Sequence, residues 1–298
     1  INDDDSNATT WQAEYTMQSG DLAGEVSFAV DYQDLAGNAG AQVKQTTDDS
    51  KVTFDESKPA GYSVSIDDLN YISLSNQTAI SFTFNGAEIG TTYNYTIDDE
   101  DDNTQAVTGS GTITAADETI SDIDVNSLGD GQLTLTVTLT DTAGNTGNEA
   151  TATIKKDTVK PHIINFTPAD EADNAGIYDE LIISFNETVA IESGSIIIKK
   201  TADDSVVEEI DVSDDRVTGS NSDTITITPK TTFSGNTGYY VLIQEDTFSD
   251  NVDNKFEGIA DKNTWNFTTV PRPAMVVTMS DNYQAGDTLA PGEKITYN

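Results

Sequence analysis

The sequence predicts an all-β protein in which several β-sandwich domains follow one another along the chain. The first observation is an alternation of apolar and polar residues with a period of two, which is typical of half-buried strands. It runs through residues 26–32, 80–84, 133–140 and 224–228. Second, no window of helical length has its apolar residues at helical spacing. Third, a short turn motif recurs once in roughly 100 residues, the length of one sandwich domain.

Composition bounds the class of protein. The 298 residues are enough for two or three domains, and 36% of them are hydrophobic, which favours folded structure over disorder. The formal net charge is −38, so we expect neither nucleic-acid binding nor direct membrane insertion. Cysteine is absent and there is one histidine, which excludes disulfides, thiolate chemistry and imidazole clusters. The start, Ile-Asn-Asp-Asp-Asp, resembles no leader, so we expect a piece of a longer chain.

The recurring motif is a five-residue acidic turn. Residues 34–38 read Asp-Leu-Ala-Gly-Asn, residues 141–145 read Asp-Thr-Ala-Gly-Asn, and residues 250–254 are a looser copy, Asp-Asn-Val-Asp-Asn. These three segments are called the Asp turns below. After each comes one further strand-like segment and then a proline: Pro59, Pro161 and Pro271. A unit of this length with about seven short strands predicts an immunoglobulin-like (Ig-like) sandwich.

The prolines divide the chain into four predicted segments. Residues 1–59 hold only the later strands of an Ig-like domain, residues 60–160 and 161–270 are each one domain, and residues 271–298 are the first strands of another. Because the first segment lacks early strands, we expect apolar side chains there without cover inside the chain. Two complete sandwiches in series, with small polar interfaces, predict an extended rod.

Several motifs carry a family resemblance. Beside the Asp turns, the first segment contains Thr-Trp-Gln-Ala-Glu-Tyr-Thr-Met at 10–17 and the second contains Thr-Tyr-Asn-Tyr-Thr-Ile at 92–97. With these motifs the chain resembles the Ig-like repeats of very large bacterial surface adhesins, including gliding-type adhesins of the Bacteroidetes and calcium-dependent biofilm adhesins. The third segment resembles another class of bacterial Ig-like domain through Phe-Thr-Pro-Ala at 166–169, Ser-Phe-Asn-Glu at 184–187 and Thr-Trp-Asn-Phe-Thr-Thr at 264–269. The resemblance implies an extracellular location at the bacterial surface and neighbouring Ig-like domains as partners. It names no distal surface or glycan ligand.

The Asp turns have two interpretations. In the first, the turn only closes a hairpin, with Gly and Asn supplying positive φ and Asp capping the turn. In the second, carboxylate, amide and carbonyl oxygens of the turn bind calcium, which takes six to eight oxygen ligands. If successive strands alternate in direction, the Asp turn and the loop between the second and third strands (the B–C loop) lie at the same end of the sandwich. This is the end where the chain enters the domain, so both would face the preceding linker. Carboxylates gathered there would repel one another unless a cation sat among them.

Calcium is therefore expected at the domain junctions, and the family resemblance supports this. The ligands expected at the first junction are Asp55, Glu88, Asp141 and Asn145. Those expected at the second are Asp157, Glu187, Asp250, Asp253 and Asn254. Asp34 and Asn38 match the motif, but the linker that would precede them lies outside this chain.

The function ranked first is a structural stalk segment of a long adhesin fibre, stiffened by calcium at its junctions and serving attachment, biofilm formation or gliding. The alternative is a glycan- or surface-binding module, which would need exposed aromatic residues around a concave pocket. An enzyme is not expected, because no pair of acids stands out as a catalytic pair. Trp11 and Trp265 lie in strand-like segments and are predicted to be core residues rather than sugar platforms.

Overall fold

A computed structural model describes residues 13–67, 70–101 and 103–272. Every regular element in these ranges is a β-strand, which confirms the all-β prediction. None of the described residues forms a helix long and apolar enough to cross a membrane. The chain divides into two compact units, residues 1–158 and residues 159–298, each described separately below. This division lies two residues before the predicted boundary at 160; the boundaries at 59 and 270 stay predictions.

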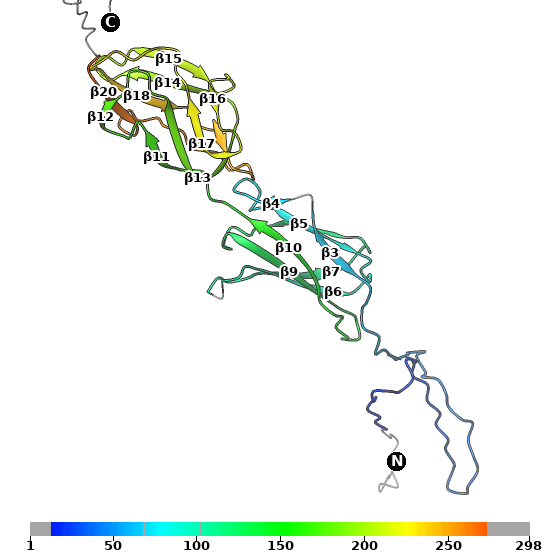
Figure 1. The fold of residues 1–298 in the computed structure, drawn as a ribbon. Coiled ribbons are helices and arrows are strands. Elements are labelled where there is room, and N and C mark those ends of the chain that lie inside the picture. Colours follow the sequence, from blue (N-terminus) through cyan, green and yellow to red (C-terminus); the bar gives the residue numbers. More distant parts are fainter. Residues whose placement is uncertain (1–12, 68–69, 102, 273–298) are drawn as a thin grey trace, which may run out of the picture. The chain divides into compact units, whose positions relative to one another are not determined.

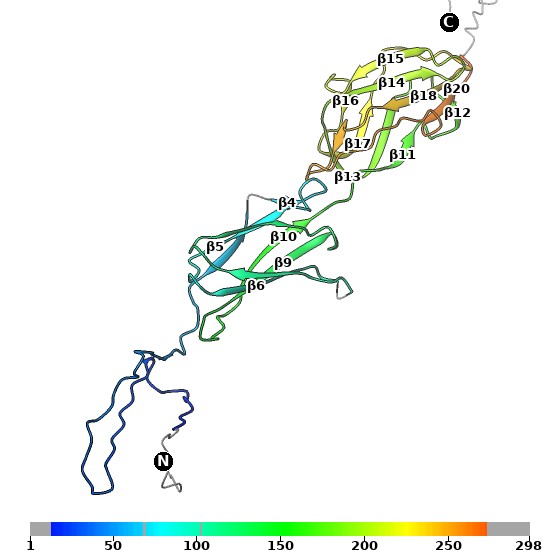
Figure 2. The same cartoon turned by 180° about the vertical axis from the view of Figure 1, so that it is seen from behind.

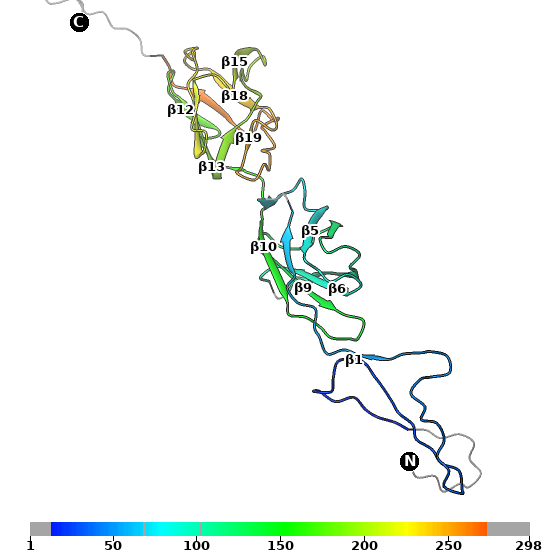
Figure 3. The same ribbon diagram turned by 90° about the vertical axis from the view of Figure 1, so that its right-hand side faces the viewer.

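Residues 13–58 form no layered sheet (Figure 3). Their two short strands, β1 (Gly24–Glu25) and β2 (Thr53–Phe54), pair antiparallel. The continuous strand expected over residues 26–32 is not formed, and isolated bridges such as Val30 to Val43 take its place. The expectation of uncovered apolar side chains is confirmed, with exposed fractions of 37–52% at Val26, Phe28, Val30 and Tyr32. An alternating pattern supplies an apolar face, but only a second layer makes that face a core. Trp11 and residues 273–298 lie outside the described residues.

The first unit contains a two-layer sandwich (Figures 1 and 2). Its larger sheet has the order β4 (Tyr71–Ile72), β10 (Ala150–Lys156), β9 (Gly131–Thr140), β6 (Thr92–Asp98) and β7 (Val107–Thr112). The smaller sheet has the order β3 (Ser63–Ile66), β5 (Ile80–Asn85) and β8 (Thr119–Ile123). The predicted alternation in β9 is confirmed, because its apolar side chains are fully buried between the layers: Leu133, Leu135, Val137 and Leu139.

Two glycines in β7 make room for tyrosine rings of the neighbouring strand. Tyr95 lies opposite Gly109 and Tyr93 opposite Gly111 in the β6–β7 register. A Cβ atom on Gly109 would stand 2.4 Å from the Tyr95 ring, so the ring can lie flat only across glycine.

Gly109→Ala is therefore expected to destabilise the first unit by about 1–3 kcal/mol, because the Tyr95 ring must leave its place. Ser110→Ala is the matched control, since the Ser110 side chain is exposed on the same strand. Calorimetric unfolding of both variants measures the difference, and equal losses would contradict the ring-on-glycine packing.

The second unit is also a two-layer sandwich with a core of its own. One sheet has the order β11 (Ile163–Thr167), β13 (Leu181–Ile191), β17 (Ser222–Ile227) and β16 (Val217–Thr218), and β19 (Phe248–Ser249) pairs with the end of β13 (Figure 3). The other has the order β12 (Ala172–Ala175), β20 (Asn266–Thr269), β18 (Gly238–Ile243), β14 (Ser195–Lys200) and β15 (Val206–Asp211). Trp265 is fully buried, so its prediction as a core residue is confirmed.

Both units share one topology. In each, the first strand pairs antiparallel with a strand of one sheet, β3 with β5 and β11 with β13. The next short strand then runs parallel to the last strand of the other sheet, β4 with β10 and β12 with β20. Two face-to-face sheets linked in this way form the predicted Ig-like sandwich, present here in tandem.

A half-buried charge cluster in the second unit contains an acid with a lowered pKa. Arg216 contacts the Glu208 carboxylate and donates two hydrogen bonds to Asp214, at 3.0 and 2.9 Å. The hydrogen bond from Arg216 lowers the pKa of Asp214 from its ordinary value to about 2. A pKa that is lower in the folded state contributes stability above the unfolded-state pKa, and this stability is lost as pH falls.

We therefore expect the melting temperature of the second unit to fall as pH drops from about 4 to about 2. In Arg216→Met the drop across this interval should be smaller, because the partner that lowers the Asp214 pKa is gone. Melting curves of both proteins over this pH range test the expectation. Parallel pH profiles would contradict it.

Candidate functional site

The three Asp turns share one hydrogen-bond pattern. In the first, Asp34 Oδ1 accepts from the backbone N–H groups of Ala36 (2.9 Å) and Asn38 (2.8 Å), and Asn38 Nδ2 donates to Asp34 Oδ2 (2.7 Å). Asp141 makes the same three bonds at 2.8, 2.8 and 2.9 Å. Asp250 repeats them at 2.8, 2.9 and 2.8 Å. The copy that deviates most in sequence thus keeps the geometry.

Positive φ in the turns comes from the fourth residue alone. Gly37 has a φ of 84°, Gly144 of 93°, and Asp253 of 71° in the third copy. The expectation that Asn also supplies positive φ is wrong, since the Asn residues of the turns are not among those with positive φ. Each Asn instead holds the Asp carboxylate with both its backbone and its side-chain N–H groups.

These bonds favour the ionised form of the carboxylate in the first two Asp turns. The amide of Asn38 lowers the pKa of Asp34, and the amide of Asn145 lowers that of Asp141. A carboxylate has about four lone-pair positions, and the turn uses three of them. One position on Oδ2 is left with which each Asp could bind a cation.

The turn also holds the chain that enters its own sandwich. Asn145 Nδ2 donates to the carbonyl of Asp55 at 3.0 Å, and Asn254 Nδ2 donates to the carbonyl of Val159 at 3.4 Å. Gly147 lies against Pro59, whose carbonyl oxygen would be 2.4 Å from a Cβ at that position. The turn therefore lies at the end of the sandwich where the chain enters, as the alternation of strand directions predicted.

The five-residue motif predicted from the sequence is too short, because it leaves out the glycine that packs against Pro59. Gly40 and Gly147 both stand six residues after the Asp, so the motif in the first two copies extends to Asp-x-Ala-Gly-Asn-x-Gly. Comparing seven residues instead of five would have found it.

The carboxylates expected at the first junction do not form a three-membered group in the described residues. Asp55 Oδ1 instead accepts from the backbone N–H of Ser57 at 2.8 Å. The bonds to Asp141 come from its own turn, and Glu88 is exposed. Asp55 approaches the turn through its main-chain carbonyl, so backbone geometry rather than charge decides this contact.

The second unit does bring two expected ligands together. Carboxylate oxygens of Glu187, on β13, and Asp250 lie within 4.8 Å of each other. Asp250 is 4% exposed and Asn254 is 2% exposed. Asp253 is directed elsewhere, because its carboxylate pairs with Lys255 at 2.6 Å. In the first unit, Asp157 follows the last residue of β10, and its N–H donates to the Ile72 carbonyl at 2.8 Å.

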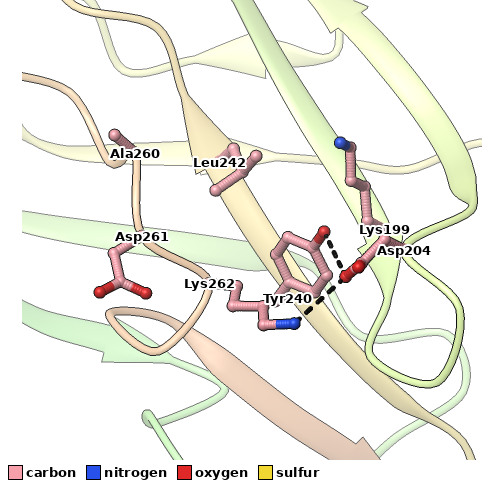
Figure 4. Close-up of a pocket in the computed structure, with 7 residues that line it drawn as sticks. All are labelled: Lys199, Asp204, Tyr240, Leu242, Ala260, Asp261 and Lys262. Atoms are coloured by element: carbon pink, nitrogen blue, oxygen red, sulfur yellow. Dashed lines mark hydrogen bonds and ion pairs between the residues drawn. The ribbon is translucent and has the colours of Figure 1, made fainter.

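A depression on the surface of the second unit is the place where the alternative function, glycan binding, would need an exposed aromatic residue (Figure 4). It has a volume of about 500 Å³ and contains Tyr240, Asp204 and Lys262. Tyr240 is 4% exposed, and its hydroxyl donates to Asp204 at 3.0 Å. Lys262 Nζ lies 3.4 Å from the same carboxylate. The aromatic face is covered and the polar groups bind one another, so this depression lacks the exposed aromatic platform that sugar binding requires.

The carboxyl groups of the described residues also bear on catalysis. Every one whose pKa departs from the ordinary value has it lowered. Hydrolysis by a carboxylate pair needs one acid whose pKa is raised. These shifted groups have the character of hydrogen-bonded structural carboxylates.

Comparison with known proteins identifies one of the two sandwiches. Residues 157–269 match the family model of the bacterial Ig-like domain, which confirms the resemblance for this part of the chain. No curated protein shows significant similarity to the chain.

Solved structures show more distant likenesses. A tetra-tandem repeat from the extending region of a large adhesion protein is 18% identical, with 83% of this chain and 55% of that chain covered and a TM-score of 0.31. The chain thus spans about half of that structure. A 1.5-MDa bacterial ice-binding adhesin is 13% identical, with coverages of 76% and 69% and a TM-score of 0.40. The FN1–FN3 domains of chicken CNTN1 are 13% identical, with coverages of 78% and 73% and a TM-score of 0.28.

Proposed function

We propose that this chain, whose residues 157–269 match the bacterial Ig-like domain, is a stalk segment of a long bacterial surface adhesin. The supporting observation is that a second sandwich of the same topology precedes the matched domain. The proposed role is structural rather than catalytic: the segment lengthens an extracellular fibre. The fibre would serve attachment, biofilm formation or gliding. Its partners are neighbouring Ig-like domains of the same chain. The net charge of −38 opposes collapse of such a fibre.

We further propose that calcium binds at Glu187 and Asp250. Two carboxylates within 4.8 Å repel each other, and Asp250 keeps a lone pair beyond its turn bonds. Asp157, which the sequence predicts as a ligand at this junction, is the third ligand in this proposal. Carbonyl oxygens and water complete the six to eight ligands that calcium takes.

Calcium should raise the melting temperature of the second unit, because an ion bound only by the folded state stabilises it. At a calcium concentration 100-fold above Kd the gain is about 2.7 kcal/mol, or roughly 10–20 °C for a domain of about 100 residues. Glu187→Gln keeps the side-chain oxygen that accepts from Asn186 but should remove most of the response. Glu209→Gln, which removes one exposed charge in the same unit, should respond like the wild type.

Calorimetry of the three proteins in calcium and in chelator tests the site. If the wild-type protein melts identically in calcium and in chelator, calcium does not bind at Glu187 and Asp250.

Small-angle scattering tests the stalk separately. We expect the measured maximum dimension to be that of an extended particle, and we expect the particle to become more flexible after chelation. A compact particle would contradict the stalk.

A further inference from the structure

Lys156, the last residue of β10, is buried to an unusual degree. It is 4% exposed, whereas lysine is almost never fully buried unless it is paired. Its ammonium donates to three backbone carbonyls, those of Val125 at 3.0 Å, Asn126 at 3.4 Å and Leu128 at 2.5 Å. Three N–H donors therefore meet three acceptors. Among the described residues, Lys156 forms no ion pair with a carboxylate.

The three carbonyls belong to one loop, residues 124–130, between β8 and β9. This segment is called the exit loop, because it lies where β10 and the chain leave the first sandwich. The carboxylates around it hold backbone N–H groups: Asp99 that of Gly129 at 2.6 Å, and Asp124 that of Asn126 at 2.8 Å. The carbonyls of the exit loop therefore accept hydrogen bonds from the ammonium, and its N–H groups donate to carboxylates.

The exit loop also fixes the residues that follow Lys156. Asp130 accepts from both the backbone N–H and the hydroxyl of Thr158, each at 3.0 Å. Burial lowers the pKa of Lys156, while the charges of Asp130, Asp124 and Asp99 oppose this shift. One positive charge thus stands among three negative ones, at the end of the first unit opposite its Asp turn.

We propose that the Lys156 ammonium is the structural cation of the exit loop and occupies a cation site made by the protein itself. Backbone carbonyls with carboxylates nearby are the ligands that hard metal ions take, and buried carbonyls need a partner. The site would accept a metal ion if the ammonium were removed. The exit end of the first unit is therefore ordered without calcium, and this inference does not depend on the calcium proposed at Glu187 and Asp250.

Three variants of the full chain test the ammonium's role in a chelating buffer with choline as the cation. Lys156→Ala and Lys156→Met should each lower the melting temperature of the first unit by about 5 °C or more. Lys155→Ala, at the exposed neighbouring position on β10, should change it by about 1 °C or less. Losses no larger than that of Lys155→Ala would overturn the proposal.

Rescue by cations tests the site itself. Calcium chloride or potassium chloride at matched ionic strength should restore at least half of the loss in Lys156→Ala. It should restore little in Lys156→Met, whose side chain fills the space. Titration calorimetry with calcium should find one more bound ion in Lys156→Ala than in the wild type. A loss that no cation reverses, or one reversed equally in both variants, overturns the proposal. The same measurements are repeated with Glu187→Gln added to every protein. Calcium bound at the site proposed above then cannot account for the rescue.

Discussion

Replacing Asp250 with alanine, in chelator, is expected to destabilise the second unit by about 2–4 kcal/mol. The substitution removes the acceptor of the backbone N–H groups of Val252 and Asn254, and it removes one of the acceptors of the Asn254 amide. Since Asp250 and Asn254 are buried, water replaces those bonds poorly. Relief of repulsion from Glu187 offsets part of the loss.

The first Asp turn provides an internal comparison. Asp34 makes the same three bonds on an exposed hairpin, so Asp34→Ala should leave the melting temperature nearly unchanged. Asp250→Asn is the second control, because an amide oxygen can still accept from the two backbone N–H groups while the charge is removed. It should retain more stability than Asp250→Ala. Equal effects at Asp34 and Asp250 would show that burial does not set the contribution of this turn.

Trp265→Ala is expected to cost the second unit about 3–5 kcal/mol, the range for deleting a large buried aromatic side chain. The indole is fully buried and stacks on Phe166 with ring centroids 4.8 Å apart. Its Nε1 donates to the Pro168 carbonyl at 2.9 Å, so the substitution also orphans a buried acceptor. Trp265→Phe keeps the stacking and loses the hydrogen bond, so its cost should be about 1–2 kcal/mol.

Calorimetry or urea unfolding that resolves the two units measures both variants. Only the second unit should lose stability, because the two apolar cores share no residue. A loss of similar size in the first unit would contradict separate cores.

Local patterns in the sequence were sufficient for much of the fold. The alternation that predicted β9 and β17 depends on which face of a strand each residue occupies, which the backbone period of two decides. The Asp turn is equally local, since all its bonds join residues within five positions of one another. Strand alternation also placed the second turn at the entry end, where Asn145 meets Asp55.

The same patterns failed where long-range packing decides. Residues 26–32 alternate as clearly as β9, yet no second layer covers them and their side chains are exposed. Asp55 and Asp141 were expected to bring their carboxylates together, but Asp55 meets the turn through its main-chain carbonyl, and calcium at this junction stays a prediction. Nothing local marks Lys156 as different from Lys155, because its three acceptors lie about 30 residues earlier in the chain.

The sequence by itself therefore determined the strands, the turns and their repetition, because backbone period and turn chemistry act over a few residues. Only the tertiary structure decided which equivalent groups are buried and what they bind. Asp34 and Asp250 make identical bonds, but one is exposed and the other buried beside Glu187. Burial sets the dielectric around a charge and the cost of an unmade hydrogen bond, and it is a property of the packed sandwich rather than of the residue.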